Sequence, residues 1–479
     1  MGAGVSRREV IVGGLGAATA AAVPNRHKTP RPRTYDVAVV GAGLAGLNAA
    51  DAIHTAGRSV IVLEARRRVG GRNLDHPIGG GAVAELGGEW AGPGQDRVLA
   101  LAKRLGVATF PTYSNGNSVY YNASGQLTKY SGDIPPASPP SLVELEAMII
   151  ELNQMASTVP AASPWSAPQA HAWDQETIAT FIVQTLHTAE GQNLAELAVR
   201  GVYGEEASEI SLLDFLQAIS GVGGDVNTLI GSAQSIRFVG GPQQLSKKLA
   251  KGLGHRVHLG VAVVAVSQKR ARVKLVSAEG DSYYARRVII TTPKTLVGRI
   301  SFSPPLPAPH DQILQREPMG SVVKVNAIYP TPFWRENNLN GAATSEVGPI
   351  RITYDNSPPD GKPGVLVGFM EGNDSRQFYG VAPAARRQAA LASFGRYFGP
   401  QALHPTGYVD LAWAEEPFTR GAYGSFNPPG VLTSLQDPFI QPVGSIHFAS
   451  SDASAIWPGY MDGAIRSGTA AAAAVLGSL

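Results

Sequence analysis

The chain contains no cysteine among its 479 residues. This absence excludes disulfides, thiolate metal sites, cysteine nucleophiles and any cofactor attached through a cysteine sulfur. Charge is also scarce, because only 16% of the residues are charged and the 40 basic residues nearly balance the 37 acidic ones. A charge so nearly balanced lacks the excess of basic residues that is expected of a nucleic-acid-binding protein. We therefore predict neither a nucleic-acid partner nor a metal site.

Long hydrophobic runs are missing as well, since none reaches the about 20 apolar residues that a membrane-spanning helix needs. A shorter run, rich in glycine and alanine, follows Arg7 and Arg8 and ends at Val23. Paired arginines before a weakly hydrophobic segment are typical of a twin-arginine signal peptide. We expect such a signal over residues 1–23, a linker over 24–34, and a protein exported in folded form to the periplasm or the medium without a membrane anchor. The alternative is an unstructured tail with a chance arginine pair.

What the chain has in abundance is apolar residues, at 44%, and glycine, at 55 residues. The first folded motif that they form is a strand–turn–helix–strand unit. Residues 35–40 and 59–63 are apolar runs of the length of buried parallel strands, and 47–56 is typical of a helix. The turn after the first strand has the glycine spacing that places dinucleotide phosphates at a helix N-terminus. Glu64 ends the second strand, where an acid accepts hydrogen bonds from an unphosphorylated ribose.

Two later segments extend this motif. Residues 65–72, Ala-Arg-Arg-Arg-Val-Gly-Gly-Arg, and 85–90, Glu-Leu-Gly-Gly-Glu-Trp, resemble the extended fingerprint of the FAD-dependent amine oxidase superfamily. The chain from about Tyr35 to its carboxy terminus resembles the flavin monoamine oxidases, most weakly between 114 and 201. The resemblance implies an α/β fold in which a Rossmann-like FAD-binding domain is interleaved with a substrate domain of mixed sheet and helices. The expected segments are 35–115, 235–300 and 410–479 for FAD, and 116–234 and 301–409 for substrate.

The motif and the resemblance together name the residues expected to contact FAD. They are Gly41, Gly43, Leu44, Ala45, Gly46, Glu64, Ala65, Arg66, Gly71, Arg72, Gly88, Glu89, Trp90, Val263, Trp413, Ala422, Asp452, Tyr460 and Met461. Arg72 is assigned to the pyrophosphate, and Asp452, in a place where the family more often has glutamate, to the ribityl and phosphate region. Ala422 occupies the position of the cysteine that carries the flavin in some members, so the resemblance implies non-covalent FAD.

The residues expected to act on the substrate are Lys324, Tyr423, Tyr460 and Gln234. Lys324 lies in an apolar strand whose alternation puts Val323 and Val325 on the opposite face. By resemblance it holds a water near flavin N5, although such a lysine is more often an exposed edge residue. The resemblance places Tyr423 and Tyr460 as two facing rings that hold the amine over the flavin, and Gln234 in the pocket wall.

The implied reaction is oxidative deamination of a small primary or secondary amine, aromatic amines included, with hydride transfer to FAD and reduction of dioxygen to hydrogen peroxide. An L-amino-acid oxidase would need an arginine for the substrate carboxylate, and Arg237 and Arg351 are the candidates. A polyamine oxidase would need carboxylates in its tunnel, and Glu205, Glu206 and Glu209 are the candidates. An enzyme with another electron acceptor, a non-catalytic flavin-binding protein, and a homodimer are also compatible with the sequence.

Overall fold

The computed structural model of the protein describes residues 33–132, 134–269 and 272–479. The expected signal peptide and most of the expected linker lie outside these residues. No helix in the described ranges is both long enough and apolar enough to cross a bilayer.

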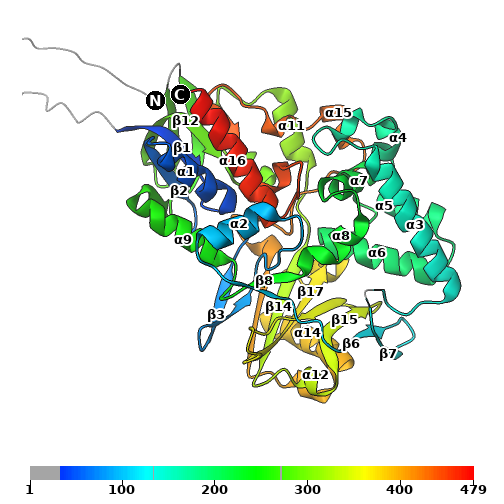
Figure 1. Ribbon diagram of the computed structural model, residues 1–479. Coiled ribbons are helices and arrows are strands. Elements are labelled where there is room, and N and C mark those ends of the chain that lie inside the picture. Colours follow the sequence, from blue (N-terminus) through cyan, green and yellow to red (C-terminus); the bar gives the residue numbers. More distant parts are fainter. Residues whose placement is uncertain (1–32, 133, 270–271) are drawn as a thin grey trace, which may run out of the picture. The chain divides into compact units, whose positions relative to one another are not determined.

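The glycine motif belongs to a sheet of eight strands among the described residues (Figure 1). Its order is β13-β10-β11-β12-β1-β2-β9, and β19 pairs with β12. The strands are β1 (Thr34–Val40), β2 (Val60–Glu64), β9 (Val257–Leu259), β10 (Val263–Lys269), β11 (Arg272–Ser277), β12 (Ser282–Ile290), β13 (Ser301–Ser303) and β19 (Ile446–Phe448). Helix α1 (Leu44–Thr55) joins the parallel strands β1 and β2, which confirms the predicted unit.

Both faces of this sheet are covered. Val37, Val39 and Val62 pack into one apolar core with helices on one side, while Ala38, Ile61 and Leu63 face a second core on the other side. The helices of the first side are α1, α2 (Asp96–Arg104), α9 (Gln243–Leu253) and α16 (Met461–Gly477). Burial on both faces explains why β1 and β2 are continuous apolar runs rather than alternating ones.

A second sheet, with seven strands in the described part of the chain, has the order β18-β14-β17-β16-β15-β6-β7. The strands are β6 (Asn117–Tyr121), β7 (Leu127–Tyr130), β14 (Val322–Tyr329), β15 (Leu339–Ser345), β16 (Ile352–Asp355), β17 (Gly364–Glu371) and β18 (Gly407–Ala412). One face packs on helix α14 (Pro383–Phe398), where Val323 and Val325 join a core with Phe394. Lys324 lies on the opposite face, as the alternation predicts.

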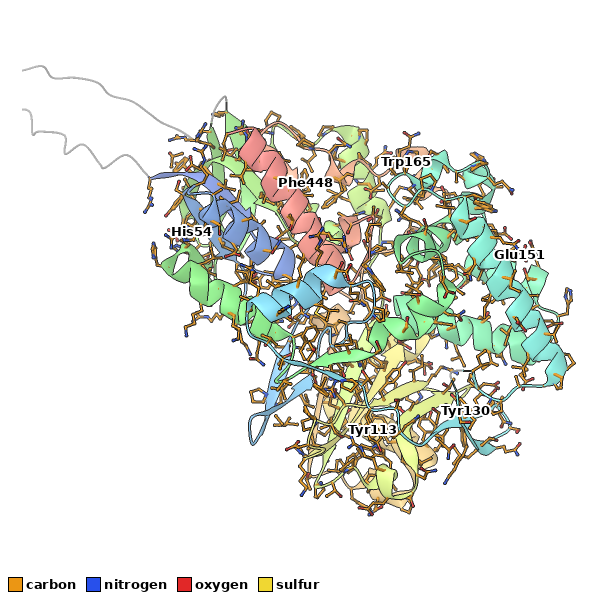
Figure 2. The ribbon with its side chains drawn as sticks, in the orientation of Figure 1. His54, Tyr113, Tyr130, Glu151, Trp165 and Phe448 are labelled. Atoms are coloured by element: carbon orange, nitrogen blue, oxygen red, sulfur yellow. The ribbon has the colours of Figure 1, made fainter. Side chains whose placement is uncertain are left out.

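A further group of helices lies beside the second sheet, and only some of its members border that sheet (Figure 1). They are α3 (Pro139–Ser157), α4 (Ala170–Gln175), α5 (Ile178–Thr185), α6 (Ala189–Tyr203), α7 (Leu212–Gly221) and α8 (Val226–Ile230). Their inward faces share one apolar core that includes Leu152 and Phe215. The outer face of α3 is mixed, because Glu151 is exposed (Figure 2) and the apolar Val143 and Ile150 are exposed to 68% and 51%.

Shorter elements connect these layers. They are β3 (Asp75–Gly79), β4 (Ala82–Glu85), β5 (Thr109–Pro111), β8 (Ile236–Phe238), α10 (Lys294–Val297), α11 (Ala308–Arg316), α12 (Phe333–Glu336), α13 (Asn373–Arg376) and α15 (Val431–Leu435). Two strands do not follow the boundaries that the sequence predicted between FAD-binding and substrate-binding segments. β13 joins the first sheet although it begins at 301, and β18 joins the second sheet although it runs past 410.

Substitution of Asp355, at the end of β16, tests how much its buried hydrogen bonds contribute to the stability of the second sheet. Asp355 is 1% exposed, and its carboxylate accepts hydrogen bonds from Trp334 Nε1 at 2.8 Å and Arg335 Nε at 2.7 Å. Asp355→Ala leaves both donors without that acceptor, so we expect the free energy of unfolding to fall by about 3 kcal/mol. Urea denaturation measures the loss. The exposed Asp360 is the control, and Asp360→Ala should change stability by less than about 0.5 kcal/mol; equal losses in the two variants would contradict this assignment.

Candidate active site

A cavity of about 760 Å³ connects the carboxyl ends of β1 and β2 with the open face of the second sheet and with helices α3 and α6. Nearly every residue expected to contact FAD or substrate lines it. Those that do are Gly41, Gly43, Leu44, Ala45, Glu64, Ala65, Arg66, Gly71, Arg72, Gly88, Glu89, Trp90, Gln234, Val263, Lys324, Trp413, Ala422, Tyr423, Asp452, Tyr460 and Met461. Gly46 is the exception, because it packs α1 against the turn at Gly41.

The glycine turn leaves room at one end of this cavity. A Cβ atom on Gly46 would lie 2.1 Å from the carbonyl oxygen of Gly41, so this glycine is required for close packing. A Cβ atom on Gly43 would have no other protein atom within 4 Å. Helix α1 starts directly afterwards at Leu44 without a side-chain cap, so the N–H groups of its first turn are available to an anion. The open space beside Gly43 and the available N–H donors of the first turn of α1 therefore lie in the same place.

Glu64 lies beside this turn, buried to 4% exposure. Its Oε2 accepts a hydrogen bond from the Ala42 N–H at 2.7 Å, and its Oε1 accepts one from the Arg66 N–H at 2.9 Å. Two backbone donors hold the carboxylate in place. Each oxygen keeps a further lone pair for a ribose hydroxyl.

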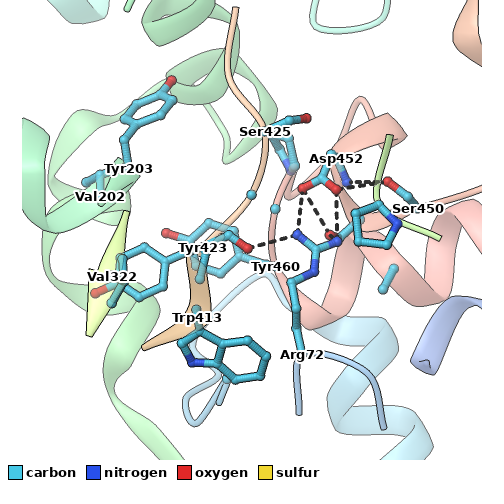
Figure 3. A pocket seen from close by; sticks show the side chains of 18 of the residues that line it. Arg72, Val202, Tyr203, Val322, Trp413, Tyr423, Ser425, Ser450, Asp452 and Tyr460 are labelled. Carbon is cyan, nitrogen blue, oxygen red and sulfur yellow. Dashed lines mark hydrogen bonds and ion pairs between the residues drawn. The ribbon is translucent and has the colours of Figure 1, made fainter. Parts of the chain in front are cut away.

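Arg72 and Asp452, expected to contact the cofactor separately, pair with each other (Figure 3). Arg72 Nη1 and Nη2 donate to the two carboxylate oxygens at 2.9 and 2.8 Å, and Nη1 also donates to the Tyr423 carbonyl at 2.8 Å. Burial opposes ionisation of Asp452, but the guanidinium outweighs it and keeps the pKa of Asp452 below its ordinary value. The pair thus fixes the backbone of Tyr423 beside the cavity.

A second helix N-terminus reaches the same cavity. Helix α16 begins at Met461, and its N-cap residue Tyr460 makes no side-chain cap hydrogen bond. Both residues line the cavity, as do Gly43 and Leu44 at the start of α1. Two helix N-termini suit a ligand with two electron-rich parts, here the pyrophosphate of FAD and the pyrimidine edge of its flavin. The residues present therefore fit FAD.

Lys324 is buried and not the exposed edge residue of the alternative interpretation. Its Nζ donates to the Gly87 carbonyl at 2.9 Å and to Glu89 Oε2 at 2.6 Å. Glu89 Oε1 lies 3.1 Å from Arg237 Nε, and Arg237 donates to both oxygens of Glu85 at 3.0 Å. Side-chain exposures of 0–3% place all four charges in the interior. The lysine side chain is therefore held at the cavity wall by two acceptors.

Tyr423 and Tyr460 both line the cavity, but different residues hold the two side chains in place. The Tyr423 hydroxyl donates to Glu371 Oε1 at 2.8 Å, and its ring packs edge-on against Phe369 with 6.1 Å between centroids. The Tyr460 ring packs edge-on against Trp457 at 5.1 Å. Burial raises the pKa of Tyr423 most, Glu371 raises it further, and Tyr354 and then Tyr460 contribute less, so the two cavity tyrosines lie within electrostatic range of each other. Figure 3 shows both beside the Arg72–Asp452 pair.

The residues considered for other substrates lie elsewhere. Arg237 is occupied by Glu85 and Glu89, and Arg351 pairs with Asp374; neither arginine lines the cavity. Glu205 and Glu209 pair with Arg376, and Glu206 pairs with Arg200; these three acids are also absent from the cavity wall. The roles considered for these arginines and acids were therefore wrong.

Sequence reasoning missed Glu371 and Tyr354, which line the substrate end with Phe369. Phe369 and Glu371 lie two positions apart on β17, all of whose residues are buried, and Tyr354 belongs to the neighbouring β16. The available signal was a single acid that ends an apolar run, Gly364 to Met370.

Comparison with known proteins agrees with this geometry. A family described as flavin containing amine oxidoreductase matches residues 44–476. The chain belongs to this family. Among its relatives, a Mycobacterium tuberculosis protein described as a flavin-containing monoamine oxidase, AofH, is 38% identical over 453 residues, 94% of this chain and 98% of the relative. Human amine oxidase [flavin-containing] B is 33% identical over 447 residues, 92% of this chain and 86% of the relative.

Solved structures of the family superpose closely on the chain. Putrescine oxidase bound to putrescine has a TM-score of 0.89 at 34% identity, and covers 93% of this chain and 99% of its own. Cyclohexylamine oxidase from Brevibacterium oxydans IH-35A has a TM-score of 0.88 at 31% identity, with the same coverage. The protein is thus an oxidoreductase of the amine-oxidising flavoproteins, with their α/β fold, and the expected family and fold are confirmed.

Substitution of Gly43 and substitution of Gly46 should have different effects. Gly43 has ordinary backbone angles and open space around it, so Gly43→Ala should fold normally but bind FAD at least about tenfold more weakly, because the added methyl group occupies the approach of the phosphates. Gly46→Ala should lower stability by about 1–3 kcal/mol through overpacking. Thermal unfolding and bound FAD per protein separate the two effects. FAD content equal to the wild type in Gly43→Ala would place the phosphates elsewhere.

Proposed function

We propose that the protein oxidises a small amine at this cavity with non-covalently bound FAD and with dioxygen as the electron acceptor, which gives an imine and hydrogen peroxide. The observation that carries the proposal is one continuous cavity with a dinucleotide cradle at Gly43 and Glu64 and two tyrosines and a buried lysine beyond it. FAD, when bound, supplies the acceptor for the hydride from the amine's α-carbon. Water then hydrolyses the imine to a carbonyl product and the free amine.

The protein's own contribution is orientation and charge. The rings of Tyr423 and Tyr460 are fixed by Phe369 and Trp457, so they orient an amine between them at little entropic cost. The apolar side chains around them exclude water and favour the neutral amine. Lys324, whose Nζ is held by Glu89, is placed to stabilise negative charge that develops next to the cavity wall.

The absence of a covalent link is supported by the residue at position 422. Ala422 is buried to 5% exposure and lines the cavity next to Tyr423. Its methyl group has no nucleophilic atom, and the chain has no cysteine elsewhere. Affinity for FAD then depends on the helix N-termini, on Glu64 and on the cavity walls.

Anaerobic addition of an amine to the purified yellow protein tests the proposal. We expect the flavin absorbance to bleach, and to return on admission of air with one hydrogen peroxide per amine oxidised. Acid precipitation should leave the flavin in the supernatant. A protein that retains its flavin yet is bleached by no member of a monoamine, diamine and amino-acid panel would contradict amine oxidation, and flavin in the acid pellet would contradict non-covalent binding.

We also propose that residues 1–23 direct export of the folded holoprotein through the twin-arginine pathway. The support is the Arg7–Arg8 pair before the weakly hydrophobic segment. The double variant Arg7→Lys, Arg8→Lys keeps the charge but removes the arginine pair, so most of the protein should stay in the cytoplasm. Cell fractionation and FAD content of each fraction measure this. An unchanged distribution would show that the segment is not such a signal.

A further inference from the structure

Helix α9 lies at the margin of the first sheet and carries three exposed lysines (Figure 1). The leucines on its inner side pack into the same core as α1. The lysines on its outer side are Lys247, Lys248 and Lys251. None of the three forms an ion pair with a residue that the structure describes, and Asp75, which Lys247 influences electrostatically, is buried. The three charges therefore face solvent.

The surroundings of α9 are basic as well. Within residues 226–278, every charged side chain is that of a lysine or an arginine. Arg67, in the loop after β2, is exposed and lies beside Gly260, which follows the edge strand β9. On α1, which packs against α9, Asp51 is paired with Arg104. This face of the molecule is therefore positive, although the whole chain is nearly neutral.

Two apolar side chains are exposed at the same edge. Val257, on β9, packs against the core that contains the inner side of α9. Strand alternation puts Leu259 on the same side of the sheet, but Leu259 is 45% exposed. Val239, just before the turn that leads into α9, is 41% exposed. Exposed lysines beside exposed apolar side chains are typical of a surface that lies in the headgroup region of an anionic membrane.

Soluble partners match this face less well. A nucleic acid or another soluble polyanion would neutralise the lysines but would leave Leu259 and Val239 in water. A stable interface with a second protein chain needs a larger apolar centre than two separate side chains provide. A bilayer accepts both kinds of side chain, because its phosphates lie directly above its acyl chains.

We propose that this face docks reversibly on a bilayer that contains anionic phospholipid. The residues that form it, here called the α9 face, are Arg67, Val239, Lys247, Lys248, Lys251 and Leu259. The four cations pair with lipid phosphates, while Leu259 and Val239 enter the headgroup region. None of the six lines the cavity, so docking leaves the cavity accessible and does not depend on the proposed amine oxidation.

Vesicle flotation of the holoprotein tests the proposal. The vesicles contain either phosphatidylcholine alone or equal parts of phosphatidylcholine and phosphatidylglycerol. We expect binding to the anionic vesicles only. At about 1 M salt the Debye length falls to about 3 Å, so this binding should be lost.

The triple variant Lys247→Gln, Lys248→Gln, Lys251→Gln removes three positive charges and keeps good helix formers on α9. Each basic residue near an anionic surface strengthens binding roughly fivefold, so affinity for the anionic vesicles should fall on the order of 100-fold. Leu259→Ser should lower the affinity about fivefold, because less apolar area enters the headgroup region.

A matched control removes the same number of charges from the second sheet and its helix. The variant is Lys129→Gln, Lys362→Gln, Arg387→Gln, at exposed positions on β7, between β16 and β17, and on α14. This control should bind anionic vesicles as the wild type does. Residues 1–34 are identical in all variants, so they cannot account for a difference. Thermal midpoint and FAD content show whether each variant is folded.

Equal binding to the two kinds of vesicle by the wild type would overturn the proposal without any variant. Equal losses in the two triple variants would overturn it too, because net charge and not the α9 face would then control binding. Retention on immobilised heparin that depends on the three lysines, with no binding to anionic vesicles, would show a soluble polyanion as the partner and would also overturn it.

Discussion

A chain of buried ion pairs, Glu85–Arg237–Glu89–Lys324, joins the short strands β4 and β8 to the second sheet at the cavity. Glu85 ends β4, Glu89 lies in the loop that follows, Arg237 is on β8 and Lys324 is on β14. Each charge has its opposite within 3.1 Å, so the cost of removing it from water is offset only while the chain is complete. These ion pairs therefore hold the loop that contains Glu89 in one position relative to the second sheet.

The electrostatics of the cavity follow from this arrangement. The N-termini of α1 and α16, neither of which has a side-chain cap, lie at the cavity wall, α1 where we expect the pyrophosphate and α16 where we expect the flavin pyrimidine. Glu371, also on the cavity wall, has no ion-pair partner among the residues that the structure describes, and Lys324 pairs with Glu89. The two ends of the cavity therefore differ in charge, and only the end with the helix N-termini favours the phosphates of a dinucleotide.

Local patterns predicted the parts of the site that neighbouring residues build. The turn at Gly41, Gly43 and Gly46 depends on backbone sterics within a few residues, and the placement of Lys324 depends on strand alternation. The family resemblance added Tyr423 and Tyr460, which line the cavity as expected.

Ion pairs between residues that are far apart in the sequence could not be predicted from local patterns. Arg72 and Asp452 are 380 positions apart, and Glu89 and Lys324 are 235 apart. A sequence pattern states that such a residue is charged, but the fold decides which opposite charge it meets. This is why Arg237 was considered for a substrate carboxylate although it belongs to Glu85 and Glu89. Glu371 was missed although it ends an apolar run, because that local pattern does not show that the fold places the acid on the cavity wall.

The most direct measurement is a crystal structure of the yellow protein as purified. It should show FAD along the cavity, with the pyrophosphate at the N-terminus of α1, the flavin between Ala422 and Lys324 without a covalent bond, and the Lys324–Glu89 pair intact. Nucleotide density outside this cavity, or a Lys324 side chain directed away from the flavin with Glu89 paired to Arg237 alone, would contradict the account.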